Sequence, residues 1–126
     1  MKNILGKTED LELFNKEGKL VYKFYKDSNG FISEYTYDSN GKELTFKNSN
    51  GFISEYTYDS NGNVLTHKEW NGYSYEYTRD SNGKELTYKD SNGYSCEYTR
   101  DSNGKELSFK DSDGITRGFD IPESKN

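Results

Sequence analysis

Aspartate and asparagine oxygens recur in the turns of this chain, and such oxygens are the ligands that Ca²⁺ prefers. The tetrapeptide Asp-Ser-Asn-Gly stands at 27–30, 38–41, 59–62, 80–83, 90–93 and 101–104. A calcium site needs about six to eight oxygens, and the EF-hand pattern needs a longer loop that ends in Glu. Each tetrapeptide offers two such side chains, so we expect turns here rather than metal sites.

Two reactive side chains occur once each, His67 and Cys96. We expect His67 to be a packed or surface histidine, and Cys96 to be a variant of Tyr75, which stands 21 residues earlier. The sequence contains no evident Ser/His/Asp or Cys/His arrangement, no metal-ligand cluster and no Gly-rich phosphate loop. These patterns predict a protein that is not an enzyme and that needs no cofactor.

The side chains that stand out are those that bind, because aromatic residues make up 16% of the chain and 12 of them are Tyr. Tyr, Trp and Arg dominate the energetics of protein interfaces. Trp70 replaces Ser in the turn 69–72, and Arg79 and Arg100 take the places of Tyr37 and Tyr58. The candidate binding residues are Tyr35, Tyr37, Tyr56, Tyr58, Trp70, Tyr73, Tyr75, Tyr77, Arg79, Tyr88, Tyr94, Tyr98 and Arg100.

Glycines set the spacing of the elements that must position these side chains. From Gly30 to Gly114 they recur in alternating steps of 11 and 10 residues, which makes a repeat of 21. Strands of alternating apolar and polar residues are expected between the turns. The long type spans 31–37, 52–58, 73–79 and 94–100, and the short type spans 42–47, 63–68, 84–89 and 105–110.

The register follows from the loop lengths. A four-residue loop at 38–41 pairs Tyr35 with Leu44, and a three-residue loop at 49–51 pairs Phe46 with Ser54. Facing residues of antiparallel strands share a face, so the rings gather on one face together with Leu44, Leu65, Leu86 and Leu107. The other face is expected to carry the Thr and Lys residues with Glu34, Glu43, Glu55, Glu76, Glu85, Glu97 and Glu106.

The ends of the chain depart from the repeat. Residues 19–26 carry apolar side chains on both faces, and we expect Leu11, Leu13 and Phe14 to fold over the resulting patch as a cap. Residues 115–121 predict a last edge strand that stops at Pro122. We expect one domain, 1–126, with a cap and first strands at 1–26, hairpin repeats at 27–114 and a last strand and tail at 115–126.

The predicted fold is all-β, a strongly twisted antiparallel meander of about eleven strands in a single sheet. Its aromatic face measures roughly 1,000 Å², more than the ~300–600 Å² of the largest apolar patch on a typical monomer. Three arrangements would cover it: the sheet coils on itself, two chains form a homodimer, or a partner protein binds.

The net charge of −5 argues against direct nucleic-acid binding, which needs a basic surface. A single cysteine excludes an internal disulfide. No apolar segment at the start resembles a signal peptide, and none elsewhere could span a membrane. We therefore expect a cytoplasmic protein without a membrane partner.

The segment Tyr35–Gly41, followed by Leu44, resembles the YD repeat of RHS and teneurin-type proteins. The motif returns at 56–62, and Arg79 and Arg100 replace its second Tyr in later copies. Leu stands three residues after Gly rather than the two usual in that family. The resemblance implies β-hairpin repeats, and MORN-type repeats are a looser match.

The function that we expect is non-enzymatic binding of another protein through the aromatic face. A short, acidic repeat chain is similar to small bacterial or phage inhibitors of the immunity or anti-defence (anti-CRISPR) type. The alternatives are a structural module that assembles with copies of itself and a carbohydrate-binding module, since aromatic platforms stack on sugar rings.

Overall fold

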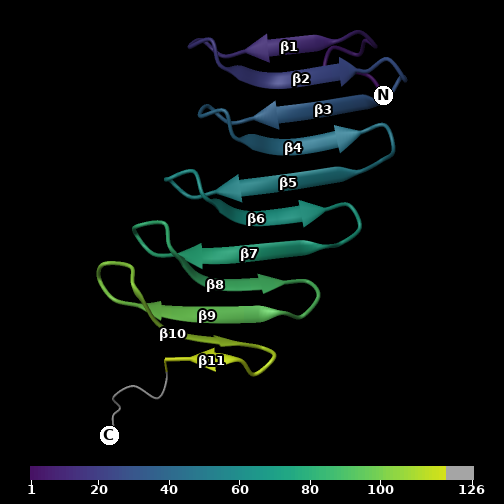
Figure 1. Cartoon of the computed structure of the whole chain (residues 1–126). Helices are drawn as coiled ribbons and strands as arrows, with labels where there is room; N and C mark the ends of the chain where they lie inside the picture. The colour runs from purple at the N-terminus through teal and green to yellow at the C-terminus, as the bar shows by residue number, and fades with distance from the viewer. Residues whose placement is uncertain (119–126) are drawn as a thin grey trace, which may run out of the picture. The chain divides into compact units, whose positions relative to one another are not determined.

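The computed structural model of this protein describes residues 1–118. Within that range the backbone forms strands and turns, and no helix occurs. The strands are β1 (Leu11–Phe14), β2 (Leu20–Lys26), β3 (Ile32–Tyr37), β4 (Glu43–Asn48), β5 (Ile53–Tyr58), β6 (Val64–Glu69), β7 (Ser74–Arg79), β8 (Glu85–Asp90), β9 (Ser95–Arg100), β10 (Glu106–Asp111) and β11 (Thr116–Arg117). Each strand is hydrogen-bonded to the next one along the chain, so the strand order is the sequence order (Figure 1). The predicted all-β antiparallel meander is confirmed.

The described chain divides into two compact units. The first contains residues 1–57 and 68–71, and therefore β1 to β4 and most of β5. The second contains residues 58–67 and 72–118, and therefore most of β6 and the strands β7 to β11. Each unit is described by itself below.

The turns share one geometry, which the leading Asp or Asn side chain fixes. Asp38 Oδ1 accepts hydrogen bonds from the backbone N–H groups of Asn40 and Lys42, at 2.8 and 2.9 Å. Asn48 makes the same two bonds in the next turn, at 3.0 and 3.1 Å. Gly41 closes its turn with φ of 85°, a left-handed conformation that favours glycine. The Asp oxygens that suggested a metal ligand are thus used to hold the turn itself.

Both kinds of turn enclose three residues. The backbone N–H of Asp38 donates to the carbonyl of Lys42 at 2.8 Å, just as that of Asn48 donates to Phe52 at 3.0 Å. The predicted four-residue loop at 38–41 is therefore wrong. The same side-chain caps specify the same turn in both places, so the extra residue of the longer step must lie in a strand.

That extra residue is a leucine in a β-bulge. The pairing changes from Tyr37 opposite Glu43 to Thr36 opposite Thr45, which leaves Leu44 without a facing residue. Equivalent bulges place Leu86 in β8 and Leu107 in β10 outside the regular register. Tyr35 consequently lies opposite Phe46 rather than the predicted Leu44, whereas the predicted pair of Phe46 and Ser54 is confirmed.

The bulges change which side chains share a face with the rings. Glu43, Glu85 and Glu106 lie opposite Tyr37, Arg79 and Arg100, and facing residues point to the same side of an antiparallel sheet. The prediction that these three glutamates lie on the polar face is wrong. The bulged leucines lie outside the regular alternation, and Leu107 is 49% exposed. One-residue bulges are what moved the glutamates, because an odd slip in register reverses side-chain direction.

The most deeply buried side chains of the first unit are Tyr22 and Phe24, at 5% and 1% exposure. They lie opposite Thr36 and Glu34 and thus on the polar side of β3. The Tyr22 hydroxyl donates to Glu34 and accepts a hydrogen bond from the Ile4 N–H at 3.0 Å. Burial and the Glu34 carboxylate raise the pKa of Tyr22 to about 12.

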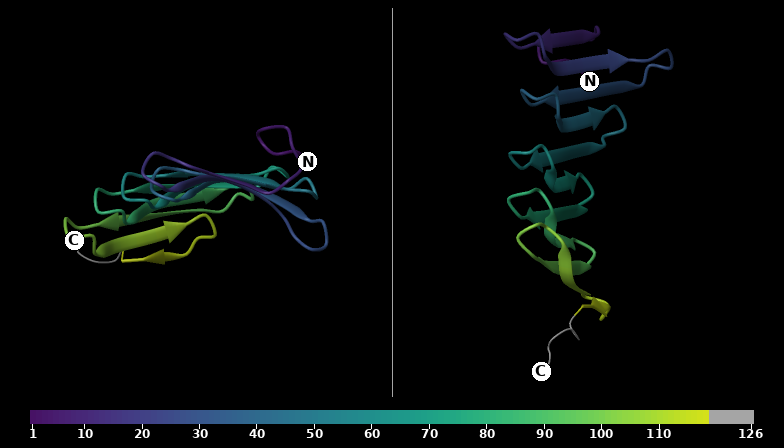
Figure 2. Two further views of the ribbon diagram at one scale, coloured as in Figure 1. Left: turned by 90° about the horizontal axis from the view of Figure 1, so that it is seen from above. Right: turned by 60° about the vertical axis from the view of Figure 1, so that its left-hand side comes forward.

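The cover over this cluster is the loop that precedes β1. Asn3 is buried and holds the loop together through hydrogen bonds to Leu5, Lys7 and Glu9. The loop rises from one side of the strands in the left view of Figure 2. Residues 11–14, predicted to be the cap, instead form β1 and extend the sheet beside β2. Their sequence alternates like a strand, and Leu11 and Leu13 share the face of Phe24 and Tyr22.

The last strand, β11, is a two-residue strand beside β10. It is followed by Gly118, which has φ of 80°, and a Cβ added there would lie 2.1 Å from the carbonyl oxygen of Leu107. Only glycine fits so close to the bulge. The predicted strand at 115–121 is thus seen at 116–117, and its end at 119–121, like Pro122 and the tail, lies outside the described residues.

Residues 1–118 include no helix with the length and apolar character needed to cross a bilayer.

Candidate binding face

Aromatic side chains collect on one side of each unit, which we call its ring face. In the first unit the ring face carries Tyr35, Tyr37, Phe46 and Phe52. In the second it carries Tyr73, Tyr75, Tyr77, Tyr88, Tyr94, Tyr98 and Phe109. Apart from Phe109, which is buried, these rings are neither fully buried nor fully exposed.

The basic unit of the ring face is a cross-strand ring pair that recurs with the repeat. Ring centroids lie 5.0 Å apart in Tyr35 and Phe46, and 5.1 Å apart in Tyr77 and Tyr88. Rings at such distances stabilise a sheet beyond the area they bury. Tyr75 and Tyr94 then flank Tyr88, with ring centroids 5.8 and 6.0 Å away, and extend the row of rings on either side of it.

Carboxylates anchor the hydroxyl ends of two rings. Tyr88 donates to Asp90 Oδ2 at 3.0 Å, and Tyr94 donates to Asp111 Oδ2 at 3.1 Å. Desolvation and these acceptors raise the pKa of Tyr88, and they raise the pKa of Tyr94 to about 12. Both phenols therefore stay protonated at neutral pH and hold their rings in place.

The two predicted arginines stack on tyrosines of their own strands. The Arg79 guanidinium lies 4.6 Å from the ring centroid of Tyr77, and that of Arg100 lies 4.6 Å from Tyr98. Their N–H groups donate to backbone carbonyls: Arg79 to Val64 and Gly83, and Arg100 to Glu85 and Gly104. These contacts stack each arginine on a tyrosine and give its N–H groups acceptors within the chain.

Glu85 brings a negative charge among the rings of the second unit. Its Oε2 accepts a hydrogen bond from the Cys96 thiol at 3.7 Å. Burial raises the pKa values of Tyr77 and Tyr98, and the Glu85 charge raises them further. Burial and the same carboxylate raise the pKa of Cys96, so the thiol is kept in its protonated, unreactive form.

His67 is buried on the ring face of the second unit, as expected for a packed histidine. Its ring centroid lies 5.1 Å from that of Tyr75 and 6.4 Å from that of Tyr73. Residues 1–118 hold no group of three or more His, Cys, Asp or Glu side chains arranged to bind a metal.

The remaining predicted binding residues lie in the first unit or near its end. Tyr35 and Tyr37 are neighbours with ring centroids 5.9 Å apart. Tyr56 and Tyr58 follow Ser54 at alternate positions of β5, and Ser54 faces Phe46. Burial, together with Glu43 and Glu69, raises the pKa of Tyr56.

Trp70 lies apart from the ring pairs, at the turn after β6, and is 63% exposed. Its backbone N–H donates to the carbonyl of Ile53 at 2.8 Å. Ser49 makes the equivalent bond to Ile32, and its hydroxyl also accepts a hydrogen bond from the Ile32 N–H at 3.0 Å. An indole has no oxygen for that second bond, so Trp70 replaces a turn-stabilising side chain with an exposed aromatic one.

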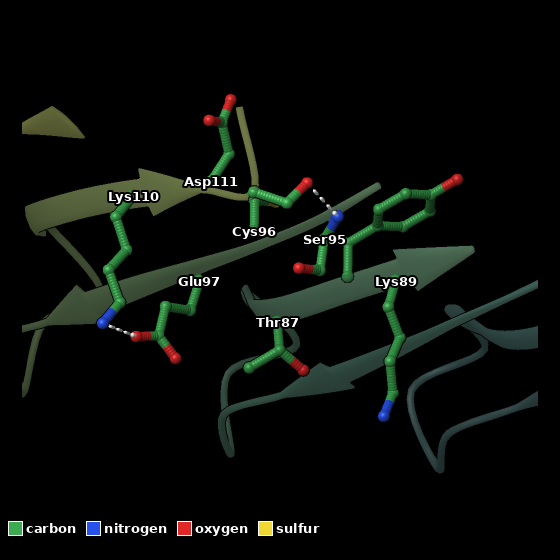
Figure 3. Close-up of a pocket in the computed structure, with 9 residues that line it drawn as sticks. Thr87, Lys89, Ser95, Cys96, Glu97, Lys110 and Asp111 are labelled. Carbon is green, nitrogen blue, oxygen red and sulfur yellow. Dashed lines mark hydrogen bonds and ion pairs between the residues drawn. The ribbon is translucent and has the colours of Figure 1, made fainter. Parts of the chain in front are cut away.

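The opposite face of the second unit has the character of a solvated surface. Figure 3 shows Thr87, Lys89, Glu97 and Lys110 on one side of the strands, with Asp111 pointing to the other side. Lys110 pairs with Glu97 at 3.0 Å, and both side chains are at least half exposed. Exposed ion pairs of this kind contribute about 0–1 kcal/mol.

Sequence reasoning did not place Glu43, Glu85, Glu106, Asp90 and Asp111 near the rings. The two aspartates could have been found, because each begins a turn and directly extends an alternating strand on the ring side. The glutamates could not be found by alternation alone. Their sequence, Lys-Glu-Leu, offers two side chains for one place on the ring face, and only the bulge decides between them.

No family model matches this sequence, and no curated protein matches it. Solved structures with a similar backbone include a chain of "TcdB2-TccC3-TEV", at 18% identity and a TM-score of 0.48. Another is a chain of the Tc holotoxin pore of Photorhabdus luminescens, at 19% identity and a TM-score of 0.49. Each comparison covers 79% of this chain and 7% of the other, so this chain spans about 7% of the length of those Tc toxin chains. The likeness is one of backbone arrangement alone.

Proposed function

We propose that this chain, a β-repeat module, is a non-enzymatic binding protein that holds a partner protein on its ring face. The observation that supports the proposal is the fixed arrangement of the rings in the second unit. Tyr88 and Tyr94 are tied to carboxylates, and Tyr77 and Tyr98 lie under guanidinium groups. Rigid aromatic side chains bind at low entropic cost, since little side-chain freedom remains to be lost.

The character of the opposite face also favours the ring face as the binding surface. In the second unit its charged residues pair with one another, as Glu76 does with Lys89 and Glu97 with Lys110. Such a face already satisfies its own charges in water. The ring face instead presents large apolar surfaces with polar groups at their edges, the composition of an interface core and its rim.

A capture experiment with the immobilised full chain tests the choice of face. The wild type should retain a defined protein from a lysate of the source cell, and Tyr77→Ser should lose it while keeping a β-sheet circular dichroism spectrum. The matched control on the other face is the double substitution of Glu76→Ala and Glu97→Ala, which should retain the same protein. Capture that survives Tyr77→Ser and Tyr75→Ser, but fails in the control, would overturn the proposal.

An inhibitor of the immunity or anti-CRISPR type is one use of such a module, and its support is the acidity of the chain. Retention on a polysaccharide resin with release by free sugar would assign the ring face to carbohydrates instead.

Self-assembly is the second candidate function, and the open sheet supports it. Among residues 1–118, β1 and β11 each have one neighbouring strand, and an unpaired strand edge can pair with another chain. Light scattering separates the two functions. Assembly predicts a mass that grows with protein concentration, whereas a binding module keeps a single mass.

A further inference from the structure

The C-terminal strand shows how the ring face accommodates an arginine. Arg117 of β11 faces Phe109 of β10, and its guanidinium lies 4.3 Å from the Phe109 ring centroid. The same guanidinium pairs with Glu106, at 3.0 Å between Nη2 and Oε2. A ring below and a carboxylate beside the guanidinium thus form a complete arginine site within the chain.

The same arrangement exists 21 residues earlier, but without the arginine. Tyr88 takes the place of Phe109, Glu85 that of Glu106, and Cys96 that of Arg117. The register agrees, since Tyr88 faces Cys96 as Phe109 faces Arg117. The Cys96 side chain is shorter than that of arginine and meets the Glu85 carboxylate through one contact, with 3.7 Å between Sγ and Oε2.

The cations nearest to this place are held elsewhere. The guanidinium groups of Arg79 and Arg100 cover Tyr77 and Tyr98 and donate to backbone carbonyls. Among the described residues, none stacks a cation on Tyr88 and none forms an ion pair with the Glu85 carboxylate.

We propose that Tyr88 and Glu85 form a binding site for one arginine side chain of the partner protein. This inference rests on the proposed function, and it names the chemistry by which the ring face recognises its partner. The guanidinium would stack on the Tyr88 ring and pair with Glu85 in the manner of Arg117. Arginine fits better than lysine, because its planar fork can stack on a ring and meet a carboxylate with two N–H groups at once.

A titration of the full chain with N-acetyl-arginine amide tests the site without knowledge of the partner. Saturable NMR shifts are expected at the Tyr88 ring and at the Cys96 and Glu85 amides. Glu85→Gln should weaken binding by about fivefold to tenfold, since a stacked and paired cation loses its pair. Glu76→Gln makes the same change of charge on the opposite face and should leave binding unchanged. N-acetyl-lysine amide should bind more weakly than the arginine probe.

A substitution that supplies the arginine within the chain is the second test. Cys96→Arg should raise the urea midpoint of unfolding, because it rebuilds the arrangement of Arg117. It should also abolish the shifts caused by the arginine probe. Combined with Glu85→Gln, Cys96→Arg should no longer stabilise the protein, and this coupling distinguishes the site from a general effect of charge.

The outcomes separate the site from the proposed function. Two results would overturn the arginine site while leaving the ring face as an interface. One is equal binding of the probe to wild type and to Glu85→Gln. The other is that Cys96→Arg stabilises the protein equally with and without the Glu85 carboxylate. Capture that is insensitive to Tyr77→Ser but accompanied by Glu85-dependent probe binding would overturn the proposed function and leave the site standing.

Discussion

Tyr98 and Phe109 lie directly opposite each other on β9 and β10, with ring centroids 5.0 Å apart. The same separation joins Tyr35 and Phe46 in the first unit. The repeat therefore reproduces a ring pair from one hairpin to the next, and this pair supplies the apolar contact that a sheet with few buried residues otherwise lacks.

The ring pair and the bulge beside it should differ sharply in their contribution to stability. Phe109→Ala should lower the free energy of unfolding by about 3 kcal/mol, because Phe109 is buried. Leu107→Ala should cost less than about 1 kcal/mol, since Leu107 is 49% exposed at its bulge. Urea unfolding measures both values. A larger loss for Leu107→Ala than for Phe109→Ala would show that the leucine, and not the ring, is the packed residue.

Tyr22 should hold the N-terminal loop through its hydroxyl. Tyr22→Phe removes the hydrogen bonds to Ile4 and Glu34 and should cost about 1–2 kcal/mol. Hydrogen exchange at the Ile4 amide should accelerate, as seen by NMR. Tyr25→Phe makes the same chemical change at a side chain that is 46% exposed and should have no effect. Unchanged Ile4 exchange in Tyr22→Phe would contradict the assignment.

Alkaline pH should destabilise the fold before it titrates these tyrosines. Burial and carboxylate neighbours raise the pKa values of Tyr22 and Tyr94 from 10.0 to about 12. The folded state therefore favours the protonated phenols, and their contribution is complete below the unfolded pKa of about 10 and is lost as the pH rises toward 12. The urea midpoint of unfolding should fall as the pH is raised from about 9 to 11.5. Tyrosinate absorbance at 295 nm should rise for these tyrosines only at a pH above the usual value of about 10. Tyrosines that all titrate near pH 10 in a still folded chain would contradict this.

We expect Trp70 to lower the stability of its turn and to contribute to binding. Trp70→Ser restores the hydroxyl that Ser49 uses in the equivalent turn and should raise the free energy of unfolding by about 0.5–1 kcal/mol. If Trp70 contacts the partner, the same substitution should weaken capture. A variant that is both less stable and fully able to bind would show that the indole packs within the chain instead.

Much of the fold could be predicted because two signals agree. The glycine spacing places the turns, and the alternation of residues such as Tyr75, Glu76 and Tyr77 places the strands between them. Each predicted repeat strand begins within one residue of its observed start. The two ends were harder, because residues 11–14 are too short to distinguish a strand from a cap by alternation.

The composition of the ring face could be predicted only in part. Rings at alternate positions of facing strands share a face in every register that shifts the pairing by an even number of residues. Tyr77 and Tyr88 were therefore placed correctly. Glu85 was placed on the wrong face, because a shorter loop with a bulge keeps the same glycine spacing as a longer loop without one. The face of Glu85 depends on the Asp80 cap, which makes a three-residue loop and moves the extra residue into β8.

The bulge is therefore the feature on which the glutamates of the ring face depend, and cross-strand NMR contacts between β7 and β8 test it most directly. The structure predicts nuclear Overhauser contacts between Thr78 and Thr87 and between the Tyr77 and Tyr88 rings, with Glu85 close to Cys96. A regular ladder without the bulge would instead place Thr78 opposite Glu85 and Tyr77 opposite Leu86. Contacts of that second kind would move Glu85 to the polar face and remove the basis for an arginine site.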